Sequence, residues 1–233
     1  MKISDPSAQR VCNELDEIVA GLPLKGARVL ELGCGKAEKT RALAQHVAWI
    51  VAMEVDAIQH ACNLEVADLP NVTFCHGAAE AIPEADGVFD IVMMFKSLHH
   101  VPVNAMDQAL REIHRVLKPG GLAWISEPVY AGEFNDILRL FHDEKDVREA
   151  AFGAVRGAVE AGLFSLAGQH FFATPGHFDS FSQFEERIIQ VTHSNHQLSP
   201  ELLAVVREKF EAHLTATGAD FQNPLRIDVL RKS

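Results

Sequence analysis

The sequence predicts an α/β fold whose mostly parallel sheet carries helices on both faces. Short apolar runs alternate five times with segments of helical spacing, which is typical of parallel strands joined by right-handed helical connections. The run Phe89–Phe95 is also almost continuously apolar, as expected for a parallel strand covered on both faces. The expected strands are Val29–Leu32, Trp49–Glu54, Val72–His76, Phe89–Phe95 and Leu122–Ser126.

Helices are expected before and between these strands. Asp5 can cap a leading helix that has Pro6 at its first position. Apolar residues then follow at helical spacing, namely Val11, Leu15, Ile18, Val19 and Leu22. Asp56 with Gln59 three residues later predicts another helix N-terminus. Two further helices are expected over Lys36–Gln45 and Met106–Lys118, the second ended by Pro119-Gly-Gly121.

The character of the chain changes after the fifth strand. Helices are expected over Phe134–Glu144 and Val147–Phe164, and the second contains three glycines that either loosen it or allow close packing. Residues 170–184 hold five of the 14 phenylalanines and are expected to mix one strand with core packing. A helix over 199–214 then precedes the alternating run Leu225–Val229, which we expect to pair antiparallel at the sheet edge.

Composition limits the classes of protein to consider. A chain of 233 residues with 48% hydrophobic content fits one domain with an elaboration. Its net charge of −11 argues against a protein that holds a nucleic-acid backbone and favours a small or cationic ligand. The four cysteines are too irregularly spaced for a zinc site and too few for a disulfide scaffold. We find neither a signal peptide nor an apolar run of about 18 residues, so a cytoplasmic protein is expected.

Twelve histidines raise the question of a metal site. No histidine pair combines i, i+4 helical spacing with the cysteine or carboxylate partners that zinc needs. His193 and His196 could share a helix face but lack evident third and fourth ligands. We therefore expect no metal.

The stretch Val29-Leu-Glu-Leu-Gly-Cys-Gly-Lys-Ala-Glu38 is the first candidate binding element. Gly33 and Gly35 allow the backbone to take a positive φ and to lie against a ligand, while the next helix can direct free N–H groups toward it. A tight turn from strand to helix that binds nothing is the alternative. The following strand favours binding, because Glu54 ends it about 20 residues after the glycines, where a ribose diol is bound in such folds.

The choice of cofactor rests on charge. A dinucleotide fingerprint requires a small residue at position 38, and the chain has Glu38 there. That carboxylate would repel a diphosphate. S-adenosylmethionine has no phosphate and carries a sulfonium cation, so it tolerates an acid-rich loop containing Glu31 and Glu38. The residues thus favour a methyl donor over a nicotinamide cofactor.

Five motifs in order carry a family resemblance: VLELGCGKAEKT, VAMEVD, FCHGAAEAIP, FDIVMMFKSLHHV and REIHRVLKPGGLAWISEP. As a set they resemble class I S-adenosylmethionine-dependent methyltransferases, with the nearest likeness to the type 11 group around the quinone-biosynthesis enzymes. The resemblance covers about residues 26–128. It implies a Rossmann-like, seven-stranded sheet, mostly parallel with an antiparallel edge strand, to which a helical cap is added.

The expected cofactor contacts follow these motifs. Glu54 is the candidate for the ribose because a carboxylate makes charge-assisted bonds to two hydroxyls and has no evident local structural role, whereas Asp56 does. In the adenine loop the family usually has an aspartate where this chain has Ala78, so backbone groups of the next two residues are expected to address the ring. The full set of expected cofactor contacts is Glu31, Gly33, Gly35, Glu54, Val55, Ala79, Glu80 and Phe95.

The loop Lys96–His100 follows the fourth strand at the edge where open α/β sheets bind ligands, so it should face the transferable methyl group. His99 or His100 is the best-placed candidate for a general base. The alternative, which we favour, is that the pair anchors the loop, because such histidines are common in the family whatever its acceptor. The expected substrate contacts are Lys96, His100, Glu127 and Tyr130.

The predicted organisation has four parts: a leading cap helix over 1–25, a cofactor-binding core over 26–128, a helical and aromatic substrate cap over 129–218, and a terminal edge strand over 219–233. The predicted function is methyl transfer from S-adenosylmethionine to a small molecule by a monomer or homodimer that binds neither nucleic acid nor membrane. A methyltransferase acting on tRNA or protein, and a non-catalytic protein that binds S-adenosylmethionine, remain the alternatives.

Overall fold

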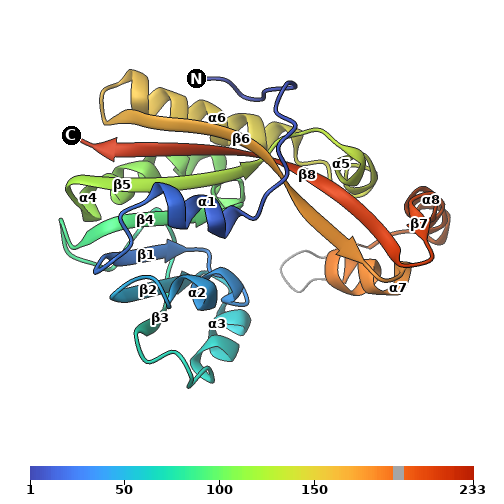
Figure 1. Cartoon of the computed structure of the whole chain (residues 1–233), viewed down its shortest axis with the longest axis horizontal. Coiled ribbons are helices and arrows are strands. Elements are labelled where there is room, and N and C mark those ends of the chain that lie inside the picture. Colours follow the sequence, from blue (N-terminus) through green and yellow to red (C-terminus); the bar gives the residue numbers. More distant parts are fainter. Residues whose placement is uncertain (191–196) are drawn as a thin grey trace.

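The computed structural model, which describes residues 1–190 and 197–233, is built on one large mixed sheet (Figure 1). Its strand order is β3-β2-β1-β4-β5-β8-β6, and the short β7 pairs with β8. The first five strands run parallel to one another, while β8 is antiparallel to both β5 and β6. The strands are β1 (Arg28–Leu32), β2 (Trp49–Glu54), β3 (Val72–His76), β4 (Phe89–Phe95), β5 (Leu117–Pro128), β6 (Phe164–Phe178), β7 (Leu214–Thr215) and β8 (Gly218–Lys232).

Helices cover both faces of this sheet. They are α1 (Glu14–Gly21), α2 (Glu38–Leu43), α3 (Ala57–Leu64), α4 (Met106–Val116), α5 (Glu133–Leu138), α6 (Lys145–Glu160), α7 (Phe181–Phe184) and α8 (Pro200–Glu211), with shorter turns η1 (Leu98–His100), η2 (Val103–Ala105) and η3 (Glu185–Ile189). Alternate residues of β1 face opposite sides, since Val29 packs with α1 and α2 whereas Leu30 packs with α4 and α6. The predicted α/β fold with a mostly parallel sheet is confirmed.

Local predictions in the parallel half agree closely with the structure. The bounds expected for β2, β3 and β4 are those observed. Asp56 caps α3 as expected, because its carboxylate accepts from the backbone N–H of Ile58 at 2.8 Å and of Gln59 at 3.4 Å. The helix expected from Lys36 is shorter, since Ala37 takes a left-handed conformation with φ of 60° and α2 begins at Glu38.

The leading helix does not begin at Pro6. It begins at Glu14, where the Asn13 side chain accepts from the N–H of Leu15. Asp5 instead closes a local turn by accepting from the N–H of Ser7. The preceding residues are extended and pair with β6, since the N–H of Cys12 donates to Ala173 O at 3.0 Å. Residues before Glu14 therefore pair with the open edge of the sheet at β6, although their apolar spacing is helical.

Several predictions in the second half are wrong. The helix expected over Phe134–Glu144 is α5, which ends at Leu138. The helix expected to run to Phe164 ends at Glu160, and Phe164 starts β6. The terminal strand pairs antiparallel as expected, but β8 lies between β5 and β6, so the antiparallel edge strand is β6. Residues 129–218, expected as a cap, therefore also contribute a strand to the main sheet.

Beyond the sheet, β6 and β8 continue together as an arm that carries α5, α7 and α8 (Figure 1). A separate cluster of phenylalanine and aliphatic side chains packs this lobe. Phe184 and Phe210 are fully buried there. The expected core role of the aromatic stretch is confirmed. In the described part of the chain, no helix has the length and hydrophobicity needed to cross a membrane.

Candidate functional site

The glycine turn after β1 lies at the carboxyl edge of the sheet. Gly33 has φ of 74° and Gly35 has φ of 51°. A Cβ on Gly33 would lie 2.9 Å from the Ser97 Cβ, so glycine allows the loop after β4 to approach closely. At Gly35 a Cβ would meet no atom within 4 Å, so the space beside the turn is open.

Glu54 connects this turn to the end of β2. Its carboxylate accepts from the N–H of Gly35 at 2.7 Å and from those of Val55 and Asp56, each at 2.9 Å. The expectation that Glu54 has no local structural role is therefore wrong. The side chain remains 7% exposed at the sheet edge, and a carboxylate that accepts three backbone N–H groups still has a lone pair for a ligand hydroxyl.

Asn63, which was not predicted as a site residue, also hydrogen-bonds to the glycine turn. Its Nδ2 donates to Gly35 O at 2.9 Å, and its Oδ1 accepts from Gln59 Nε2 at 2.9 Å. The side chain is 2% exposed. The sequence held no signal for this role, because the burial of Asn63, which makes such a polar group require partners, is visible only in the structure.

The other expected cofactor residues surround this edge at different depths. Glu31 is buried beneath α2 and accepts from Thr40 Oγ1 at 2.7 Å. Burial outweighs that bond and raises the pKa of Glu31 to about 7. Val55 is exposed beside Glu54, Phe95 is buried, and Ala79 and Glu80 are half-buried after β3.

The loop after β4 is fixed at its first two residues. The N–H of Lys96 donates to Ser126 O at 2.8 Å, and Ser97 Oγ donates to Leu32 O at 2.9 Å. Lys96 itself has φ of 53°, which is uncommon for a residue with a side chain. Of the histidine pair, His99 is buried and His100 is exposed.

His99 lies between two buried carboxylates. Its Nδ1 is 2.5 Å from Glu127 Oε2, and its Nε2 is 3.5 Å from Glu144 Oε1. Glu127 also accepts from the N–H of Leu98, and Glu144 also binds Arg148. Burial opposes a charge on His99, but the hydrogen bonds to the two carboxylates prevail and raise its pKa to about 9. We call these four side chains, His99, Glu127, Glu144 and Arg148, the buried ion network.

The structure changes the interpretation of two expected substrate residues, Glu127 and Tyr130. Glu127 is fully buried and both of its oxygens are bonded, which argues against the expected substrate contact. Tyr130 is half-buried. The Lys145 N–H, followed by the Tyr130 hydroxyl, lowers the pKa of the Asp143 carboxyl. His100 remains exposed beside His99, with ring centroids 4.1 Å apart.

Residues with metal-ligand chemistry do come together at this point. Donor atoms of His99, His100 and Glu144 lie within 4.8 Å of one another, the one such group among residues 1–190 and 197–233. Sequence spacing did not reveal it, because the ligand types come from two distant segments. A protonated His99 and the Arg148 guanidinium already neutralise the carboxylates. His193 and His196 lie outside the described residues.

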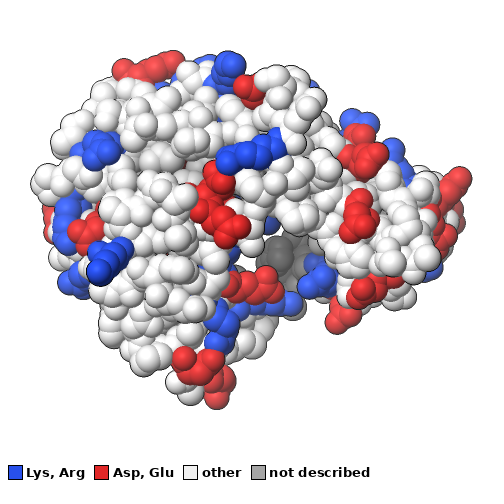
Figure 2. Space-filling view, viewed as in Figure 1, with Lys and Arg blue, Asp and Glu red and all other residues white. Residues whose placement is uncertain are grey.

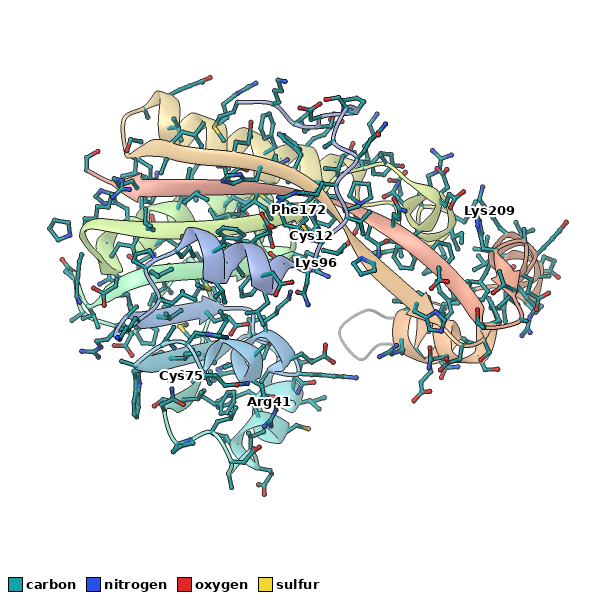
Figure 3. The ribbon with its side chains drawn as sticks, in the orientation of Figure 1. Cys12, Arg41, Cys75, Lys96, Phe172 and Lys209 are labelled. Carbon is teal, nitrogen blue, oxygen red and sulfur yellow. The ribbon has the colours of Figure 1, made fainter. Side chains whose placement is uncertain are left out.

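A cleft of about 220 Å³ opens beside Lys96. Its lining residues are Asn13, Glu14, Lys39, Lys96, Thr174, Pro175 and Leu225. Figure 2 shows the molecule hollowed between the body and the lobe, with acidic and basic side chains along the rim. Figure 3 places Lys96 on the side of the body that faces this hollow. The cleft therefore lies between the loop after β4, which contains Lys96, and the strands β6 and β8 that form the arm.

The fold is Rossmann-like, and the loops after β1, β2 and β4 converge at the carboxyl ends of these strands, where such sheets bind ligands. Comparison with known proteins agrees, since residues 29–121 match the methyltransferase domain family. Within residues 29–121 the chain is therefore similar to methyltransferase domains.

Individual relatives cover the chain unevenly. An uncharacterized methyltransferase of Synechocystis sp. is 36% identical over 42% of this chain and 45% of its own length. A demethylmenaquinone methyltransferase of Lysinibacillus sphaericus is 35% identical over 42% of each chain. The chain thus spans less than half the length of these two relatives. The crystal structure of the YcgJ protein from Bacillus subtilis shares the fold, with a TM-score of 0.67 and 19% identity over 94% of this chain and 97% of that one.

Proposed function

We propose that this protein transfers a methyl group from S-adenosylmethionine to a small-molecule acceptor. The observation that carries the proposal is the convergence of the glycine turn, Glu54 and the Lys96–His100 loop at one sheet edge beside a cleft. The open space at Gly35 and the carboxylate of Glu54 fit the ribose end of this cofactor. When bound, the cofactor supplies an electrophilic methyl group on a sulfonium.

The residues of the chain contribute orientation more than proton transfer. Methyl transfer is an in-line displacement, and orientation alone can supply roughly 7 to 11 kcal/mol toward such a step. The acceptor's lone pair forms the new bond to carbon while the carbon–sulfur electrons return to sulfur. His99 anchors the loop through the buried ion network. His100, which is exposed, is the histidine that can take a proton from an acceptor that must lose one.

The alternative functions receive less support. The net charge of −11 disfavours a tRNA substrate, because neutralising phosphates requires a basic surface. A non-catalytic binding protein would retain the cofactor edge but would not need a second cleft beside Lys96. The cleft of about 220 Å³ therefore favours a small acceptor.

Incubation of the protein with a metabolite extract and methyl-labelled S-adenosylmethionine tests this function. We expect mass spectrometry to find a small metabolite that gains one labelled methyl group, and Glu54→Ala should abolish most of that signal. Label recovered only in the tRNA or protein fraction would contradict the small-molecule assignment. Tight cofactor binding without transfer to any fraction would support a non-catalytic role instead.

Asn63→Ala tests the support of the glycine turn. Loss of its hydrogen bond to Gly35 should weaken binding of S-adenosylhomocysteine about 5- to 10-fold, since one such bond contributes about 1 kcal/mol. Titration calorimetry measures the change. Asn71→Ala is a matched control, because the Asn71 amide donates to Ala44 O at 2.8 Å, away from the turn. Equal affinities in both variants would exclude this role for Asn63.

A further inference from the structure

Lys96 is held in a conformation that its residue type does not favour. A left-handed backbone at a residue with a Cβ persists only where the surroundings enforce it, and such positions are frequent at functional sites. Here the N–H bond to Ser126 and the close packing of Ser97 on Gly33 enforce it. The backbone thus places the Lys96 side chain in the cleft, where it is exposed.

The charges that line the cleft leave one positive charge uncompensated. Glu14 is buried, accepts from Trp124 Nε1 at 3.2 Å and pairs with Lys39 Nζ at 3.1 Å. Lys39 also lies 5.7 Å from the centre of the Phe95 ring. The Lys96 ammonium, by contrast, forms no hydrogen bond or ion pair with any residue of 1–190 or 197–233. The cleft carries one net positive charge, although the chain as a whole has a net charge of −11.

The surroundings of the amine favour an anionic partner. Desolvation by the protein around it lowers the pKa of Lys96, although Glu14 counteracts this. The exposed ammonium has no partner in the protein, so it is available to a ligand, and a carboxylate or phosphate would form charge-assisted hydrogen bonds with it. The overall acidity of the chain had favoured a small or cationic ligand, but the local charge at Lys96 favours the opposite sign.

The position of the cleft indicates which ligand supplies that anion. Its walls include Asn13 before α1, Thr174 of β6 and Leu225 of β8, all outside the cofactor-binding turn at β1 and β2. The cofactor also carries a carboxylate, but Asn13 and Thr174 belong to the segments 1–25 and 129–218, which were expected to cap the site. We propose that the methyl acceptor is a small organic anion whose carboxylate or phosphate binds the Lys96 ammonium. This inference rests on the proposed methyl transfer.

Ion-exchange fractionation of the metabolite extract tests the charge of the acceptor. Each fraction is incubated with wild-type protein and labelled S-adenosylmethionine, and we expect transfer only in the fraction retained by an anion exchanger. Phosphatase treatment of that fraction then separates the two anions, because it removes a phosphate acceptor and leaves a carboxylate. Transfer confined to neutral or cation-exchanger fractions would overturn the inference while supporting methyl transfer. Transfer in no fraction would overturn both.

Substitution of Lys96 tests the contact itself with the active fraction. Lys96→Met should raise the apparent KM for the acceptor about 10- to 100-fold, as expected for loss of a charge-assisted bond. Lys96→Arg keeps the positive charge and should bring the apparent KM most of the way back to the wild-type value. Lys96→Asn is a second neutral variant, since asparagine tolerates the left-handed backbone well. Lys209→Met, an exposed lysine on α8 in the lobe, controls for the change in net charge (Figure 3).

The affinity for cofactor shows whether Lys96 binds the anionic group of the acceptor or the carboxylate of the cofactor. We expect S-adenosylhomocysteine to bind Lys96→Met and Lys96→Asn within about twofold of wild type by calorimetry. Equal weakening of cofactor and acceptor binding would assign Lys96 to the cofactor carboxylate and overturn the inference. An unchanged KM in both neutral variants would overturn it as well.

Discussion

Glu54→Ala is expected to weaken binding of S-adenosylmethionine by about 30- to 150-fold. Glu54 bonds the N–H groups of Gly35, Val55 and Asp56, so its removal loosens the turn and also removes the carboxylate proposed to bind the ribose. Loss of charge-assisted bonds of this kind amounts to about 2 to 3 kcal/mol. Titration calorimetry with the cofactor and with S-adenosylhomocysteine measures the change.

Two variants separate the ribose contact from damage to the turn. Glu54→Gln retains one carbonyl acceptor for Gly35 but lacks the second carboxylate oxygen, so an intermediate affinity is expected. Asp56→Ala removes the cap of α3 and should lower the unfolding free energy by about 1 kcal/mol with little change in cofactor affinity. If Glu54→Ala bound as tightly as wild type while Asp56→Ala did not, the ribose contact would belong to Asp56.

The sequence was most informative where local pattern and tertiary role coincide. β2 and β4 are buried on both faces, so they are continuous apolar runs whose ends are visible without any knowledge of their neighbours. The Asp56 cap is likewise a contact between residues two and three positions apart. Such elements depend little on the rest of the chain.

The failures share a dependence on distant partners. β6 contains Gly168, Pro175 and Gly176, and its pairing with β8 joins residues as far apart in the sequence as Phe164 and Lys232, which no local period reveals. The buried ion network likewise unites His99 of η1 with Glu127 of β5 and Glu144 before α6. The pattern indicated that the Lys96–His100 loop faces the ligand edge, but not that one histidine faces inward.

Glu127→Ala is expected to destabilise the protein by about 3 to 5 kcal/mol. It removes one partner of a buried pair and leaves His99 and the N–H of Leu98 without their carboxylate. Urea unfolding at constant pH measures this. Asp68→Ala is the matched control, because the Arg41–Asp68 pair is exposed to solvent and its loss should change the unfolding free energy much less.

The His99–Glu127 pair makes the unfolding free energy depend on pH, and the direction of the His99 pKa shift fixes the sign of that dependence. The pKa of His99 rises from 6.5 to about 9 on folding, so its stabilising contribution is complete below pH 6.5 and is lost as the pH rises through 9. Such a shift corresponds to about 3 kcal/mol. Folding raises the pKa of Glu31 to about 7, so the unfolding free energy also falls as the pH rises from the unfolded pKa of Glu31 to 7. The contribution of His99 is therefore best measured above pH 7.5.

The difference between wild type and variants isolates the His99 contribution, because the other titrating groups are common to both. Between pH 7.5 and 9.5 we expect the unfolding free energy of wild type to fall more steeply than that of Glu127→Gln, in which His99 loses its shorter bond, and His99→Gln should remove this slope entirely. Parallel profiles in all three proteins would mean that His99 is neutral in the folded state. In that case the loop after β4 would be held by neutral hydrogen bonds alone, and Glu127→Ala should destabilise by about 1 to 3 kcal/mol.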